Sequence, residues 1–195
     1  MNFPLQLSFP VLTIAQKISV TDADNQTVCF VRQKILKLKE AIEVFTDSTR
    51  SQKICDIKAD RVLDFSANYH FYDCNGADFG AVARKGMKSI WRAHYDIMKD
   101  GAVDMNISEE NPWVKMVDGM VGEIPIVGFF SGLMFHPSYV ITNAATGQQL
   151  VRIKKRRAFF ESRFSVEKLS EFNGDDELRI VMSILMMALL ERGRG

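Results

Sequence analysis

The densest group of residues able to do chemistry is a run of cations in the last third of the chain. The candidate anion-binding residues are Arg152, Lys154, Lys155, Arg156 and Arg157. In a β-strand alternate side chains share a face, so Arg152, Lys154 and Arg156 are expected on one side. Such a row can hold phosphate, because guanidinium and ammonium groups form charge-assisted hydrogen bonds with its oxygens.

Three interpretations of this basic row remain open. The row can be the solvated outer face of a strand, where lysines also discourage edge pairing. It can contact anionic lipid, where each cation would add about 1 kcal/mol, screened by salt. It can bind nucleic acid, although a net charge of +1 provides no global field for that partner. A second basic group, Lys34, Lys37 and Lys39, is interpreted as ordinary surface.

Catalytic and metal-binding patterns are weak. His70 and Cys74 are four residues apart, but a strand running into a turn does not bring them together as a helix would. The segment Gly128–Gly132 lacks a serine midway between its glycines, as a nucleophile elbow needs, and no phosphate-binding glycine loop is present. Thr21–Asn25 departs from a calcium loop, which needs a glycine at its turn and a closing glutamate. We therefore predict no catalytic residue, metal or cofactor, and an enzyme with an unrecognised site is kept as a third hypothesis.

The elements that must position these residues are mostly hairpins. Four times, two strand-like runs flank a short turn rich in Asp, Asn, Gly or Ser, as antiparallel hairpins require. The four predicted hairpins are Lys17–Val31, Glu43–Ile57, His70–Val82 and Tyr139–Ile153. Turns at this spacing favour a sandwich or a barrel.

Two segments are expected to be helical. In Ser108–Gly122, either Ser108 before two glutamates or Asn111 before Pro112 can begin a helix, and apolar residues follow at helical spacing. Leu178–Leu190 is apolar around its whole circumference, is preceded by acids and is followed by arginines. At 13 residues it is too short to span a bilayer, so protein must enclose it. We predict a mainly β fold, a closed antiparallel barrel around this helix.

Several segments resemble the tubby C-terminal-like superfamily, in particular bacterial LURP-one-related and phospholipid-scramblase-like proteins. The resemblance covers the chain from about residue 15 onward and rests on Thr21–Val31, Tyr72–Ala83, Glu110–Met116, Gly122–Pro125, Ala158–Phe164 and Leu189–Arg192. It implies a barrel of about twelve strands around a C-terminal helix. Tubby proteins bind phosphoinositides through basic residues and scramblases carry a calcium-binding segment. None of those functional residues can be placed in this sequence.

Length and composition are those of a globular protein. The chain has 195 residues, 47% hydrophobic and 25% charged, and we expect a single domain over residues 1–195. Three cysteines without a CxxC pair and no basic, apolar leader predict a cytoplasmic protein, peripheral to the membrane at most. We expect a non-enzymatic module whose partner is an anionic membrane surface or a protein. The alternative is an interaction or structural protein with no small ligand, suggested by the apolar segment Ile124–Phe135.

Overall fold

The computed structural model describes residues 1–10, 15–34, 41–61, 67–84, 94–110, 138–156 and 161–192, which contain twelve strands and one long helix. The strands are β1 (Leu5–Pro10), β2 (Ala15–Thr21), β3 (Thr27–Lys34), β4 (Ile42–Phe45), β5 (Lys53–Ala59), β6 (Asn68–Asp73), β7 (Asp78–Arg84), β8 (His94–Lys99), β9 (Ala102–Glu109), β10 (Ser138–Asn143), β11 (Gln149–Arg156) and β12 (Glu161–Lys168), and the helix is α2 (Gly174–Arg192).

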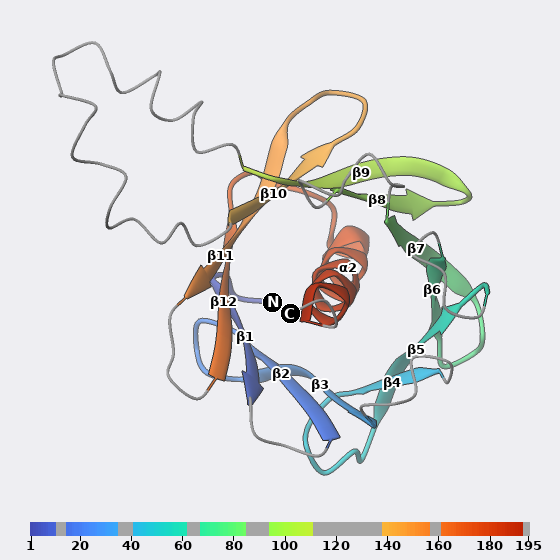
Figure 1. The fold of residues 1–195 in the computed structure, drawn as a ribbon, viewed down its shortest axis with the longest axis vertical. Helices are drawn as coiled ribbons and strands as arrows, with labels where there is room; N and C mark the ends of the chain where they lie inside the picture. The colour runs from blue at the N-terminus through green and yellow to red at the C-terminus, as the bar shows by residue number, and fades with distance from the viewer. Residues whose placement is uncertain are drawn as a thin grey trace, which may run out of the picture.

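The strands form one closed antiparallel barrel. Each strand pairs with its neighbours in the chain, and β12 returns to pair with β1, so that Leu5 lies opposite Val166 and Pro10 opposite Glu161. Figure 1 shows the ring of strands with α2 inside it. Closure leaves no strand edge unpaired, which removes the usual route to edge-to-edge aggregation. The structure thus confirms the predicted fold.

The core is the contact between α2 and the inner wall. From Arg179 to Leu189 every residue of α2 is at most 3% exposed. The wall supplies alternate apolar side chains, such as Cys55 and Ile57 on β5. Ser183 is the buried hydroxyl of the helix, and it donates a hydrogen bond to the Arg179 carbonyl at 2.8 Å. The apolar circumference of the helix is therefore enclosed by protein, as predicted.

The two ends of the barrel differ in their connections. At one end, which we call the turn end, the connections are residues 22–26, 46–52, 74–77, 100–101, 144–148 and, into α2, 169–173. At the other, the loop end, they are residues 11–14, 35–41, 60–67, 85–93, 110–137 and 157–160. The helix begins at the turn end and finishes at the loop end, because it follows β12 directly and its Glu191 lies beside the last residue of β7.

Side chains of aspartate and asparagine close the short turns. Asp22 accepts the amides of Asp24 and Gln26, both at 3.0 Å, and Asp73 accepts those of Asn75 and Ala77 at 2.8 Å. These carboxylates satisfy backbone donors that have no ladder partner. All four predicted hairpins are present, as β2–β3, β4–β5, β6–β7 and β10–β11.

The helix predictions were partly wrong. Ser108 and Glu109 do not begin a helix, since they belong to β9 and pair with Val140 and Tyr139. A pairing ladder with β10 outweighs a local capping signal there. Residues 111–122, the rest of that predicted helix, lie outside the described residues. Residues 35–40, which include Lys37 and Lys39 of the second basic group, also lie outside them. The C-terminal helix is longer than predicted at both ends, and its first turn contains the expected acids. No helix in the described ranges is long and apolar enough to cross a membrane.

Gly80 on β7 allows the first turns of α2 to pack closely against that strand. Arg179 is 2% exposed and forms ion pairs with Asp104 and Asp176. Its aliphatic stem lies against Gly80, where an added Cβ would overlap the Arg179 side chain and lie 2.7 Å from the Met98 carbonyl oxygen. Gly80 also has φ +145°, which L side chains rarely adopt. The absence of a side chain is what lets the helix approach this strand.

We expect Gly80→Ala to destabilise the fold by about 3 kcal/mol, because backbone strain is joined by overlap with a carbonyl that cannot move alone. Gly76→Ala is the matched control: Gly76 has φ +82° but open space around it, so strain alone should cost about 1 kcal/mol. Urea unfolding of both variants measures the difference. Equal losses would show that Gly80 has no steric role.

The two core cysteines should be inert. Burial raises the pKa of the Cys29 and Cys55 thiols to about 12, whereas Cys74 is exposed. At pH 8 the buried pair therefore stays protonated and shielded, and thiolate is the reactive form. We expect iodoacetamide to modify Cys74 alone in the native protein and all three cysteines in denaturant, as read by mass spectrometry. Native labelling of Cys29 or Cys55 would contradict this placement.

Candidate functional site

Charge is distributed unevenly between the two ends. The turn-end connections contain five acids, Asp22, Asp24, Asp47, Asp100 and Glu171, against the single cation Arg50. The sequences of the loop-end connections contain eight Lys and Arg against six Asp and Glu. The net charge of +1 therefore conceals an acidic turn end.

The first half of the predicted basic row is already neutralised by acids. The guanidinium of Arg152 lies 3.2 Å from Glu110, which also accepts a hydrogen bond from the Ser138 hydroxyl. Lys154 donates to both carboxylate oxygens of Glu167 on β12, each at 3.0 Å. Alternation is as predicted, because Val151 and Ile153 are buried while these cations point outward.

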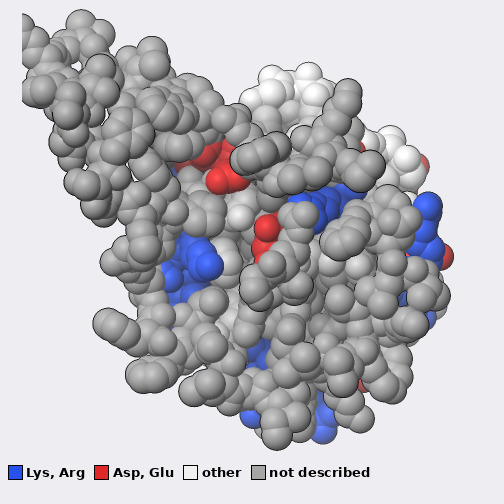
Figure 2. Space-filling view, viewed as in Figure 1, with Lys and Arg blue, Asp and Glu red and all other residues white. Residues whose placement is uncertain are grey.

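The described residues in the second half of the basic row are exposed to solvent. Lys155 and Arg156 are exposed at the loop-end terminus of β11, and neither has an ion pair in the described part of the chain. Arg156 lies opposite Arg163 in the pairing of β11 with β12. In the view of Figure 2, Lys and Arg side chains are visible at several places on this face, one of them where Figure 1 has β11. Arg157 lies outside the described residues.

A second polar group lies inside the barrel at the loop end. The hydroxyl of Tyr95, on β8, donates to the Glu191 carboxylate of α2 at 2.5 Å. Arg84, the last residue of β7, has its guanidinium 4.0 Å from the same carboxylate and 5.9 Å from the centre of the Tyr95 ring. Tyr139 of β10 is 6% exposed and close enough to feel the charges of Glu191, Glu109 and Arg84. We call Arg84, Tyr95, Tyr139 and Glu191 the lumen cluster.

Sequence reasoning missed the lumen cluster. A signal was present, since Gly80, Val82 and Arg84 alternate along β7 and so share its inner face. A charge at an inward position of a buried strand requires a partner. Burial raises the pKa of Tyr95 and of Tyr139, and for Tyr95 the Glu191 hydrogen bond adds to the rise. Both hydroxyls therefore remain hydrogen-bond donors at neutral pH.

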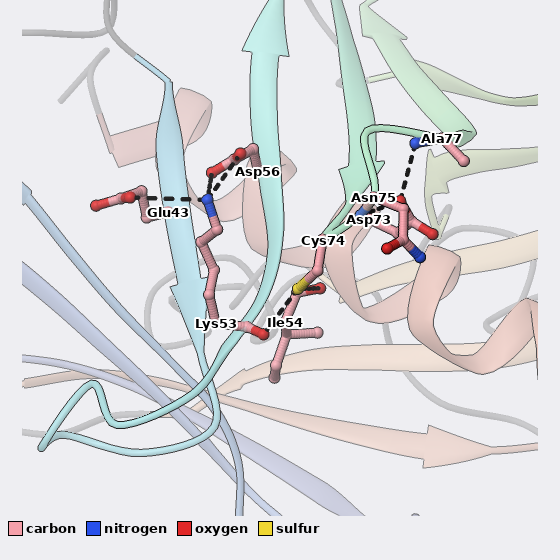
Figure 3. A network of polar contacts seen from close by, with 8 residues as sticks. All are labelled: Glu43, Lys53, Ile54, Asp56, Asp73, Cys74, Asn75 and Ala77. Carbon is pink, nitrogen blue, oxygen red and sulfur yellow. Dashed lines mark hydrogen bonds and ion pairs between the residues drawn. The ribbon is translucent and has the colours of Figure 1, made fainter.

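The outer wall carries a third network (Figure 3). Lys53 of β5 bonds both oxygens of Asp56, at 3.2 and 3.1 Å, and lies 4.0 Å from Glu43 of β4. The hydrogen bonds to Asp56 raise the pKa of Lys53. The Cys74 thiol bonds the Lys53 carbonyl oxygen at 3.0 Å. These contacts tie the β6–β7 turn to β5, and every group in them has a partner.

The two histidines in the described part of the chain, His70 and His94, have separate partners. His70 of β6 lies 2.8 Å from Asp78 of β7, and His94 lies 3.4 Å from Asp96 on the same strand, β8. Cys74 bonds backbone carbonyls, so the structure does not bring His70 and Cys74 together. Within the described ranges no three His, Cys, Asp or Glu side chains form a group that could hold a metal ion.

Comparison with known proteins informs only the fold. No family model matches the chain, and no curated protein matches it. An X-ray structure of a protein from Arabidopsis thaliana is similar, with a TM-score of 0.50 and 10% sequence identity, over 97% of this chain and 92% of that one. At this identity the similarity concerns architecture, and what the protein does must be argued from its own residues.

Proposed function

We propose that this protein is a non-enzymatic binding module that docks on an anionic membrane surface by its loop end. The observation that supports the proposal is the exposed pair Lys155 and Arg156, which lacks acidic partners in the described part of the chain while Arg152 and Lys154 have them. Cations held by carboxylates contribute little to an external anion, because their charge is already offset.

The position of the pair supports the same assignment. Lys155 and Arg156 lie at the end of the barrel opposite the acid-rich turn end. An anionic surface would attract one pole and repel the other, which orients the barrel before contact. The resemblance to lipid-binding tubby proteins agrees with this partner class. The alternative of a protein-interaction module rested on Ile124–Phe135, which lies outside the described residues.

We expect Lys155→Gln/Arg156→Gln to weaken binding to phosphatidylserine vesicles about 30-fold at low salt. Each cation near an anionic surface is worth about 1 kcal/mol, and two give about 2 kcal/mol. Vesicle flotation measures binding, with neutral vesicles and high salt as reference conditions that should abolish it.

The matched control is Arg50→Gln/Lys99→Gln, which removes two charges from the turn end. This variant should float like the native protein. Equal losses in both double variants would mean that net charge alone matters, and an unchanged Lys155→Gln/Arg156→Gln variant would reject the proposed surface.

A further inference from the structure

The lumen cluster contains hydrogen-bond donors that nothing in it uses. Arg84 has an 8% exposed side chain and five N–H donors, yet among the described residues its nearest carboxylate oxygen, on Glu191, is 4.0 Å away, beyond hydrogen-bond range. In the described part of the chain neither this guanidinium nor the Tyr139 hydroxyl forms a hydrogen bond. A mostly buried guanidinium that has no hydrogen-bonded acceptor among the described residues, with a tyrosine hydroxyl nearby, has the capacity to hold an oxyanion.

These donors are also reached by solvent. The wholly enclosed polar atoms that lack a hydrogen bond among the described residues include the Nε atoms of Arg152 and Arg179, and none belongs to Arg84 or Tyr139. Arg84 closes the loop-end terminus of β7, and Tyr139 is the second residue of β10 at the same end. The group therefore lies at the mouth of the barrel, while the interior beyond it is apolar.

Glu191 is placed where a carboxylate gains least from its own helix. It lies in the last turn of α2, at the negative end of the helix dipole, where acids are disfavoured. Its carboxylate is nevertheless fixed by the short hydrogen bond from Tyr95, and it is 26% exposed. The cluster therefore already holds one carboxylate, and that carboxylate is tethered to a helix end.

We propose that Arg84, Tyr95 and Tyr139 form a binding site for an oxyanion, a carboxylate or phosphate, and that Glu191 occupies this site until such a ligand displaces it. The incoming oxyanion would take the Tyr95 hydrogen bond and the Arg84 charge, and would add the unused donors of Arg84 and Tyr139. Glu109, on β9 opposite Tyr139, is a second acid near these donors. This site goes beyond the proposed membrane docking and does not include Lys155 or Arg156.

Removal of the internal carboxylate should create measurable binding. We expect Glu191→Gln to bind inorganic phosphate at least tenfold more tightly than the native protein, as measured by isothermal titration calorimetry. Tyr139→Phe in the Glu191→Gln background should reverse part of the gain, and Arg84→Gln should abolish it. A gain of binding cannot arise from unfolding, and thermal melts of each variant confirm the folded state.

The charge-matched control is Glu43→Gln, which removes an acid from the outer wall and should leave phosphate affinity unchanged. The proposal is overturned if Glu191→Gln binds no better than Glu43→Gln, or if its gain survives Arg84→Gln.

Titration of Glu191→Gln with acetate and with a short-chain phosphatidate identifies the source of the oxyanion that the site binds. A preference for phosphatidate over phosphate assigns the site to a lipid head group, and equal affinity assigns it to free small anions. Flotation of Glu191→Gln/Arg84→Gln should match that of the native protein, which separates this site from the membrane surface.

Discussion

The constraint on which the structure depends is a helix that is apolar on every side. Nineteen residues of α2 extend about 28 Å, and its central eleven residues are enclosed. A sheet that faces one side of a helix cannot bury its whole circumference, whereas a closed barrel can. Each strand must then present apolar side chains inward, which accounts for the strict alternation seen in β5, β8 and β9. The closure of the barrel and the apolar inner face of its strands both follow from the need to enclose this helix.

Polar groups at the two ends of α2 fix which way the helix points. Arg179 needs Asp104 and the space above Gly80, both near the turn end, and Glu191 needs Tyr95 and Arg84 at the loop end. Apolar packing alone would allow the helix to slide or to reverse its direction, because the hydrophobic effect is non-directional. A buried charge cannot move away from its partner without a large desolvation cost. Strand β7 takes part at both ends, since its inner face carries Gly80 and Arg84.

What the sequence could predict was local or compositional. Asp22 and Asp73 form turn contacts within four residues, so their hairpins follow from short-range chemistry. The enclosure of α2 follows from its composition. What escaped prediction depends on register across the barrel: Lys154 meets Glu167, and Tyr95 meets Glu191 from 96 residues away. The incorrect helix start at Ser108 has the same origin, because pairing with Val140 decided its conformation.

The same strand register explains why the exposed cations of β11 and the lumen cluster are separate features. Along β11 the outward cations near the strand's middle find acids on neighbouring strands, and Arg156 at its end faces Arg163. Inside the barrel the wall is apolar until the loop end, where Arg84 is the first cation able to meet solvent. Cations that remain available on both surfaces thus lie at the end opposite the acidic turns. A negatively charged surface that aligned the barrel by its outer cations would also face the C-terminus of α2. Glu191 would then be the group nearest to any anion entering the lumen, so docking and displacement would act along one axis.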